Sequence, residues 1–232
     1  EIELPAVQRR VVEALKTAGK RIVFVNFSGA AIALEPESQN CEAILQAWYP
    51  GQAGGQAVAE VLFGDYNPAG KLPLTFYRNL AQIPDFEDSN MTGRTYRYMK
   101  ETPLFPFGHG LSYTTFKYGK LKMNDDKIAA GQNLNLVIPV TNTGSRDGDE
   151  VVQVYLKKMD DTEGPVKTLR AFKRVRIPAG KTVEVKFSLN DTQLEWWDEQ
   201  SNTMRVCPGN YTVMIGGTSC EKSLLSRTFT IR

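Results

Sequence analysis

Residues 47–77 read AWYPGQAGGQAVAEVLFGDYNPAGKLPLTFY and combine two turns, a helix pattern and an extended exit. The aromatic–Pro–Gly turn Trp48–Gly51 is followed by the pair Gly54–Gly55, which allows a neighbour to approach the start of a helix because no side chain intervenes. Apolar spacing predicts a helix over residues 54–63, with Gly64 as its C-cap. On spacing alone, this pattern favours a glycine-rich βα loop with a structural role.

The residues before this stretch predict alternating helices and strands. Apolar residues over 7–15 recur at helical spacing, whereas 21–27 (RIVFVNF) and 41–49 (CEAILQAWY) are typical of short buried strands. This order predicts an α/β layer with a mostly parallel sheet. Ligands of such sheets bind outside the carboxyl ends of the strands, which here are Asn26–Gly29 and Trp48–Gly51.

After residue 77 the periodicity changes twice. Residues 77–116 lack regular spacing but carry many aromatic rings, which predicts an ordered strap packed over a surface, because rings need apolar cover. From residue 118 apolar residues alternate in about seven short strands, as in a β-sandwich. We therefore expect two domains, an α/β domain at 1–117 that includes the strap and a β-sandwich at 118–232.

Composition excludes several classes of function. The net charge of +2 is spread along the 232 residues, so nucleic acid is not an expected partner, and no apolar run approaches the ~20 residues that span a bilayer. Cys41, Cys207 and Cys220 form neither a disulfide framework nor a zinc spacing, and the single histidine, His109, is expected to be structural. The chain has no G-x-S-x-G elbow and no P-loop, and no cofactor or metal is implied.

Three motifs in order carry a resemblance to glycoside hydrolase family 3. The segments W-Y-P-G-Q-A-G-G-Q-A and L-F-G-D-Y-N-P-A-G-K-L-P-L-T-F resemble the C-terminal α/β sandwich of that family. G-R-T-Y-R-Y and F-P-F-G-H-G-L-S-Y-T-T-F (93–98 and 105–116) resemble its next signature. N-T-G-S-R-D-G-D-E-V-V-Q-V-Y-L (142–156) resembles its fibronectin type III-like, immunoglobulin-like module.

The resemblance implies part of a retaining exo-β-glycosidase, either a β-xylosidase or a β-glucosidase, that acts on a β-linked oligosaccharide or glycoside. Such enzymes use two carboxyl groups. The family's nucleophile is an Asp of a preceding barrel, and its acid/base Glu lies shortly before a segment that Ile2–Pro5 resembles. We therefore expect both carboxylates upstream of Glu1 and an inactive fragment. The family also implies a periplasmic or extracellular parent, whereas the residues determine neither compartment nor oligomeric state.

Within the chain, the best-placed carboxylates are Glu35 and Glu37, which follow a strand end and are candidates for a substrate-side pair. Other acidic groups are expected to be solvated turn residues; these are Asp125–Asp126, Asp147, Asp149, Glu150 and Asp160–Asp161. The alternative function is a non-catalytic carbohydrate- or protein-binding scaffold module. Of the adjacent Trp196 and Trp197, only one can face the core.

Overall fold

The computed structural model describes all residues from Glu1 to Arg232, which form two compact units. The α/β unit comprises residues 1–66, 74–95 and 99–106, and the β unit comprises residues 67–73, 96–98 and 107–232. The two units therefore interleave along the chain and do not follow the single boundary expected at 117/118. The difference arises because Arg97 and Phe107 of the strap accept backbone hydrogen bonds from the β-sandwich. Contacts between residues so far apart in the chain leave no periodic pattern in the sequence.

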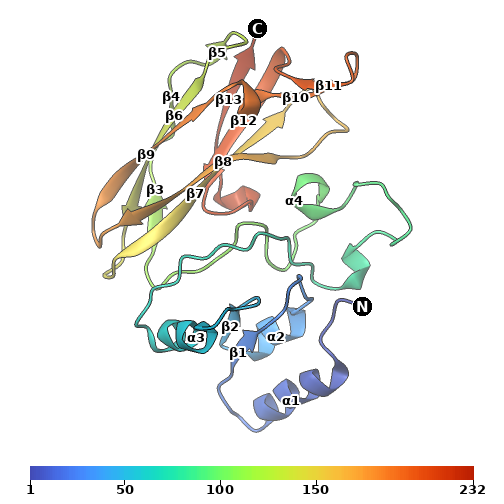
Figure 1. The fold of residues 1–232 in the computed structure, drawn as a ribbon, viewed down its shortest axis with the longest axis vertical. Helices are drawn as coiled ribbons and strands as arrows, with labels where there is room; N and C mark the ends of the chain where they lie inside the picture. The colour runs from blue at the N-terminus through green and yellow to red at the C-terminus, as the bar shows by residue number, and fades with distance from the viewer. The chain divides into compact units, whose positions relative to one another are not determined.

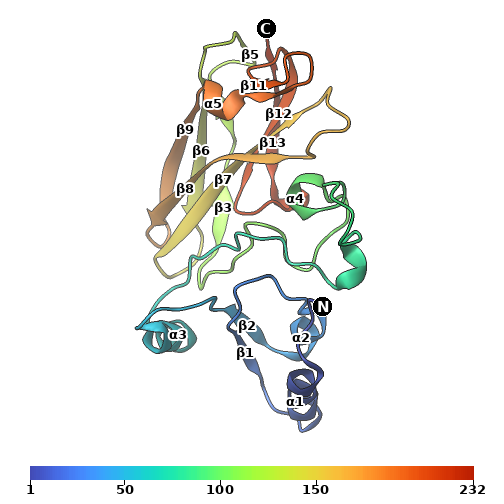
Figure 2. The same cartoon turned by 45° about the vertical axis from the view of Figure 1, so that its right-hand side comes forward.

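The α/β unit contains a short parallel sheet between helices, as the sequence predicts (Figure 1). Its elements are α1 (Ala6–Thr17), β1 (Val23–Asn26), α2 (Glu35–Asn40), β2 (Ala43–Gln46), α3 (Gly54–Phe63) and the short helix η1 (Leu80–Gln82). Strand β1 pairs in register with β2, while α1 and α2 lie on one side of this pair and α3 lies on the other (Figures 1 and 2). The predicted helix 54–63 is confirmed, and Gly64 ends it with φ +84°, a conformation that favours glycine.

Helix α1 has an apolar stripe of which only one residue is buried within this chain. Val12 packs inward, whereas Val7, Val11 and Leu15 are exposed. The helical spacing correctly indicates the helix, but it does not reveal which apolar side chains have a packing partner.

The β unit is a sandwich of two mostly antiparallel sheets (Figure 1). One sheet has the order β5-β13-β12-β7-β8, and the other has the order β3-β6-β4 with β9 paired to β6. The strands are β3 (Phe116–Tyr118), β4 (Lys122–Met123), β5 (Lys127–Ile128), β6 (Leu134–Asn142), β7 (Gly148–Lys158), β8 (Thr168–Ile177), β9 (Thr182–Leu189), β12 (Gly209–Gly216) and β13 (Leu225–Ile231). The short helices are α4 (Thr95–Tyr98), α5 (Asp191–Leu194) and η2 (Glu221–Ser223), and a separate hairpin joins β10 (Trp196–Asp198) to β11 (Thr203–Arg205). The predicted combination of α/β and all-β folds is thus confirmed.

Alternating side chains of both sheets fill the core of the sandwich. Leu136 and Ile138 of β6, Tyr155 of β7 and Tyr211 of β12 are fully buried. The Tyr211 hydroxyl donates to the Cys207 carbonyl oxygen at 2.8 Å, a tyrosine corner of the kind that recurs in immunoglobulin-like sandwiches. These contacts explain why the strand pattern from residue 118 predicts the sandwich well.

The segment before the adjacent Trp196 and Trp197 is a short helix. Residues Asp191–Leu194 form helix α5, because the Asn190 side chain accepts from the Thr192 backbone N–H in a capping box. Strand β10 begins at Trp196, which is buried, while Trp197 is 51% exposed. All three cysteines have free thiols.

Candidate functional site

The carboxyl ends of β1 and β2 are joined by a compact polar cluster. Asn26, which is buried, donates from Nδ2 to Ser28 Oγ at 2.9 Å and to Gln46 Oε1 at 2.7 Å. Gln46 in turn donates from Nε2 to Ser28 Oγ at 3.1 Å. The cluster fixes the two strand ends at the edge where parallel sheets bind ligands.

An exposed aromatic ring lies at this same edge. Tyr49 follows β2 and is 80% exposed, although the outer end of its ring lies against Gly29. A Cβ at Gly29 would come within 2.4 Å of Tyr49 Cε2, so the ring can take this place only because residue 29 is glycine. Trp48 has φ +55°, which is uncommon for a residue other than glycine, and its ring contacts Phe76 edge-on with centroids 6.2 Å apart.

Both predicted substrate-side carboxylates lie on helix α2, and each is bound by an arginine. Glu35 Oε1 accepts from Arg78 Nη1 at 2.8 Å, and the Glu35 side chain is 30% exposed. Glu37 is buried, with a side chain 1% exposed; its Oε1 accepts from Arg9 Nε at 3.1 Å, while Oε2 has no hydrogen-bond partner. Glu37 thus ties α1 to α2. A role of either residue toward a substrate stays a prediction.

The rings of the aromatic strap are ordered and are divided between the two units. In the α/β unit, Phe76 packs edge-on against Phe105 with centroids 6.3 Å apart. In the β unit, Tyr96 stacks on Phe107 at 4.3 Å and meets the buried Tyr155 edge-on at 5.9 Å. These rings therefore serve packing within each unit.

A buried polar cluster joins residues 67–73 and 107–115 to the sandwich within the β unit. Glu150 is expected to be a solvated turn residue, but this is wrong: it lies in β7 and is buried. Its Oε1 accepts from the Tyr118 hydroxyl at 3.0 Å and lies 3.4 Å from Lys71 Nζ, which also donates to the Gly110 carbonyl oxygen at 3.0 Å. The partners stabilise a carboxylate that the local sequence suggests is exposed.

Burial changes the protonation of this cluster. Burial raises the pKa of Glu150 above its ordinary value of 4.5, although the Lys71 ammonium acts in the opposite direction. Burial also lowers the pKa of His109 below 6.5, and the nearby Lys71 lowers it further. His109 is therefore neutral at pH 7, in keeping with a structural rather than an acid–base role.

We expect Glu150 to make the stability of the β unit depend on pH. A carboxyl whose folded pKa is raised contributes stability that is complete below its unfolded pKa and is lost as the pH rises through the folded pKa. Glu150→Gln removes this titration, so the free energy of unfolding of the variant should rise relative to that of the unmodified chain as the pH increases above about 4.5. Urea unfolding at a series of pH values measures this difference. Glu184→Gln, an exposed residue of β9, controls for the loss of one carboxylate; a pH-independent difference for Glu150→Gln would contradict the prediction.

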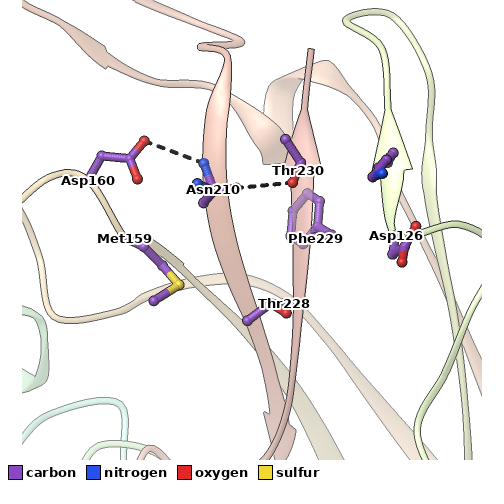
Figure 3. A pocket seen from close by; sticks show the side chains of 8 residues that line it. Asp126, Met159, Asp160, Asn210, Thr228, Phe229 and Thr230 are labelled. Atoms are coloured by element: carbon purple, nitrogen blue, oxygen red, sulfur yellow. Dashed lines mark hydrogen bonds between the residues drawn. The ribbon is translucent and has the colours of Figure 1, made fainter.

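The β unit also contains a shallow hollow of about 440 Å³ at the ends of β5, β7, β12 and β13 (Figure 3). Thr230 Oγ1 donates to Asn210 Oδ1 at 3.0 Å, and the Asn210 backbone N–H donates to Asp160 Oδ2 at 3.4 Å. Met159 and Asp126 complete its wall. The side chains of Thr230 and Asp160 are thus both hydrogen-bonded to Asn210.

Several of the other predicted turn acids also have structural partners. Asp149 lies in β7 rather than in a turn, and its Oδ2 accepts from Arg174 Nε at 2.7 Å. Asp161 Oδ2 accepts from the Trp196 indole N–H at 2.6 Å, and Asp147 Oδ2 accepts from Arg176 at 3.2 Å. No group of three or more His, Cys, Asp and Glu side chains is arranged to hold a metal ion. None of the helices is both long and apolar enough to span a bilayer.

Comparison with known protein families agrees with both halves of the fold. Residues 1–113 match the glycosyl hydrolase family 3 C-terminal domain. The chain belongs to the C-terminal part of glycoside hydrolase family 3. Residues 150–219 match the fibronectin type III-like domain. The resemblance inferred from the three sequence motifs is thereby confirmed.

Individual relatives are named as β-glycosidases and are much longer. The chain is 54% identical to a xylan 1,4-beta-xylosidase of Xylanibacter ruminicola, over 99% of this chain and 26% of that protein. Among solved structures, a β-glucosidase from Erythrobacter marinus superposes with a TM-score of 0.87 at 38% identity, covering 100% of this chain and 31% of that one. A variant β-glucosidase from Listeria innocua in complex with laminaribiose superposes with a TM-score of 0.85 at 27% identity, covering 100% of this chain and 33% of that one. The chain thus spans a quarter to a third of these proteins and corresponds to their C-terminal part.

Proposed function

We propose that this chain is the C-terminal part of a retaining, exo-acting β-glycosidase that hydrolyses terminal β-xylosyl or β-glucosyl residues from oligosaccharides or glycosides. The observation that carries the proposal is the 54% identity to a xylan 1,4-beta-xylosidase, which extends over 99% of the chain and thus over both units. The same relative favours a β-xyloside over a β-glucoside as the substrate.

Retaining hydrolysis needs two carboxyl groups about 5–5.5 Å apart, one as the nucleophile and one as the acid and base. Within residues 1–232, Glu35 and Glu37 are each held by an arginine, and Glu150 is paired with Lys71. A carboxylate held in an ion pair is poorly suited to attack an anomeric carbon. We therefore assign both catalytic carboxylates to residues of the longer protein outside this chain.

The role proposed for the α/β unit is to form one side of the substrate site with the carboxyl ends of β1 and β2. Of the two sequence-predicted candidates, Glu35 is the better placed to orient a sugar hydroxyl, because its side chain is partly exposed whereas that of Glu37 is buried. Glu37 is better explained as a structural partner of Arg9. Neither assignment requires a metal or an organic cofactor.

The chain alone is expected to be inactive, because without a nucleophile no covalent glycosyl intermediate forms. The test compares the purified chain with the longer protein that contains it, using 4-nitrophenyl β-xyloside and β-glucoside. The longer protein should release nitrophenol, faster from the xyloside, while the chain should not exceed a heat-inactivated control. Turnover by the chain alone would contradict the assignment of the catalytic groups.

The second candidate function is a non-catalytic module that binds carbohydrate or protein, and the arginine-bound carboxylates are the observation that favours it. It predicts that the longer protein is inactive on every aryl β-glycoside while this chain is retained on insoluble xylan. That result would replace the glycosidase proposal.

A further inference from the structure

We propose that Tyr49, together with Phe27, forms a platform on which a pyranose ring of the substrate stacks at the carboxyl ends of β1 and β2. The inference rests on the proposed β-glycosidase function and adds a specific binding position to it. Phe27 directly follows β1 and Tyr49 lies three residues after the end of β2, and both are exposed, Tyr49 to 80% and Phe27 to 56%.

The Tyr49 ring is supported on one side and open over the rest of its surface. Its outer end lies on Gly29, where an added Cβ would be 2.4 Å from Cε2 and 2.9 Å from Cζ. Residue 29 thus provides the space in which the ring is held at this edge of the sheet.

The backbone that carries the two rings is held rigidly. The cluster of Asn26, Ser28 and Gln46 links the residues next to Phe27 with the end of β2. On the other flank, Trp48 adopts φ +55° and its ring contacts the buried Phe76. A backbone that is fixed before a ligand arrives loses little conformational entropy on binding, which suits a weak ligand such as a single sugar ring.

The chemistry of the edge fits a sugar better than an apolar protein surface. A pyranose offers C–H groups on its faces and hydroxyls at its rim, so it needs an aromatic face next to hydrogen-bonding groups. Here the hydroxyl of Tyr49 and the partly exposed Ser28 and Gln46 accompany the two rings. An interface with another protein domain would instead favour a contiguous apolar patch.

The experiment titrates the 232-residue chain with xylotriose and with laminaribiose and follows amide chemical shifts. We expect saturable shifts at residues 26–29 and 46–51, and a dissociation constant for Tyr49→Ala that is raised about tenfold, as expected for the loss of one aromatic contact. Tyr49→Phe keeps the ring but not the hydroxyl, and it should lose much less affinity than Tyr49→Ala. Phe86→Ala removes a ring that is 99% exposed elsewhere in the α/β unit, and it should leave binding unchanged.

Three outcomes would overturn the platform: no saturable shifts in the unmodified chain, an unchanged affinity of Tyr49→Ala, or an equal loss of affinity in Phe86→Ala. Burial of Tyr49 against another domain in the longer protein, seen as protection of its ring from chemical modification, would also overturn it. These results can be distinguished from a failure of the proposed function. If the longer protein hydrolyses aryl glycosides but the titration gives one of these outcomes, the glycosidase proposal is supported and the platform is not.

Discussion

Replacement of Gly110 by alanine should destabilise the β unit by about 3 kcal/mol, near the upper end of the usual cost of overpacking. A Cβ at this position would lie 2.0 Å from the Gly70 carbonyl oxygen, which is a backbone atom and cannot rotate away. Relief requires the segments 67–73 and 107–115 to separate. That movement would break the hydrogen bond from the Leu72 N–H to the His109 carbonyl oxygen and weaken the contact of Lys71 with Gly110.

The measurement is urea unfolding of the chain, with hydrogen exchange of β12 amides to report on the β unit. Gly70→Ala is the matched control, because nothing lies within 4 Å of a Cβ at Gly70, and it should change stability by less than about 0.5 kcal/mol. Equal stability of the two variants would show that the segments 67–73 and 107–115 are not packed as described. A loss confined to the α/β unit would contradict their assignment to the β unit.

Tyr211→Ala should cost about 4 kcal/mol, because it removes a fully buried ring from the centre of the sandwich. The ring stacks on Phe229 with centroids 5.5 Å apart and contacts Trp196 edge-on at 6.2 Å. Its hydroxyl donates to the Cys207 carbonyl oxygen at 2.8 Å, a buried acceptor that the substitution leaves unpaired.

Two further variants separate the ring from the hydroxyl. Tyr211→Phe keeps the ring and should cost only about 1–2 kcal/mol, the penalty for an unpaired buried carbonyl. Phe172→Ala removes an exposed ring of β8 and should change stability by less than about 0.5 kcal/mol. Free energies from urea unfolding test this order, and a cost for Tyr211→Ala no greater than that for Tyr211→Phe would contradict the packing role of the ring.

The sequence predicts where a candidate site lies, whereas the contacts within it come from the tertiary structure. The order of helices and strands is sufficient to predict that Asn26–Gly29 and Trp48–Gly51 share one edge of the sheet, because parallel strands direct their carboxyl ends to the same side. The pairing of Glu35 with Arg78 joins residues 43 positions apart, and no local pattern indicates it. The approach of Tyr49 to Gly29 depends likewise on the packing of separate loops.

The sequence by itself determined the local elements and the family. Helix 54–63, its glycine cap and the alternating strands of the sandwich follow from backbone preferences and side-chain periodicity, which act over a few residues. Only the tertiary structure decided the division into interleaved units and the burial of Glu150. The physical reason is that a buried charge is stable only where distant partners reach it, here Lys71 and Tyr118, and the chain brings these together only when it folds.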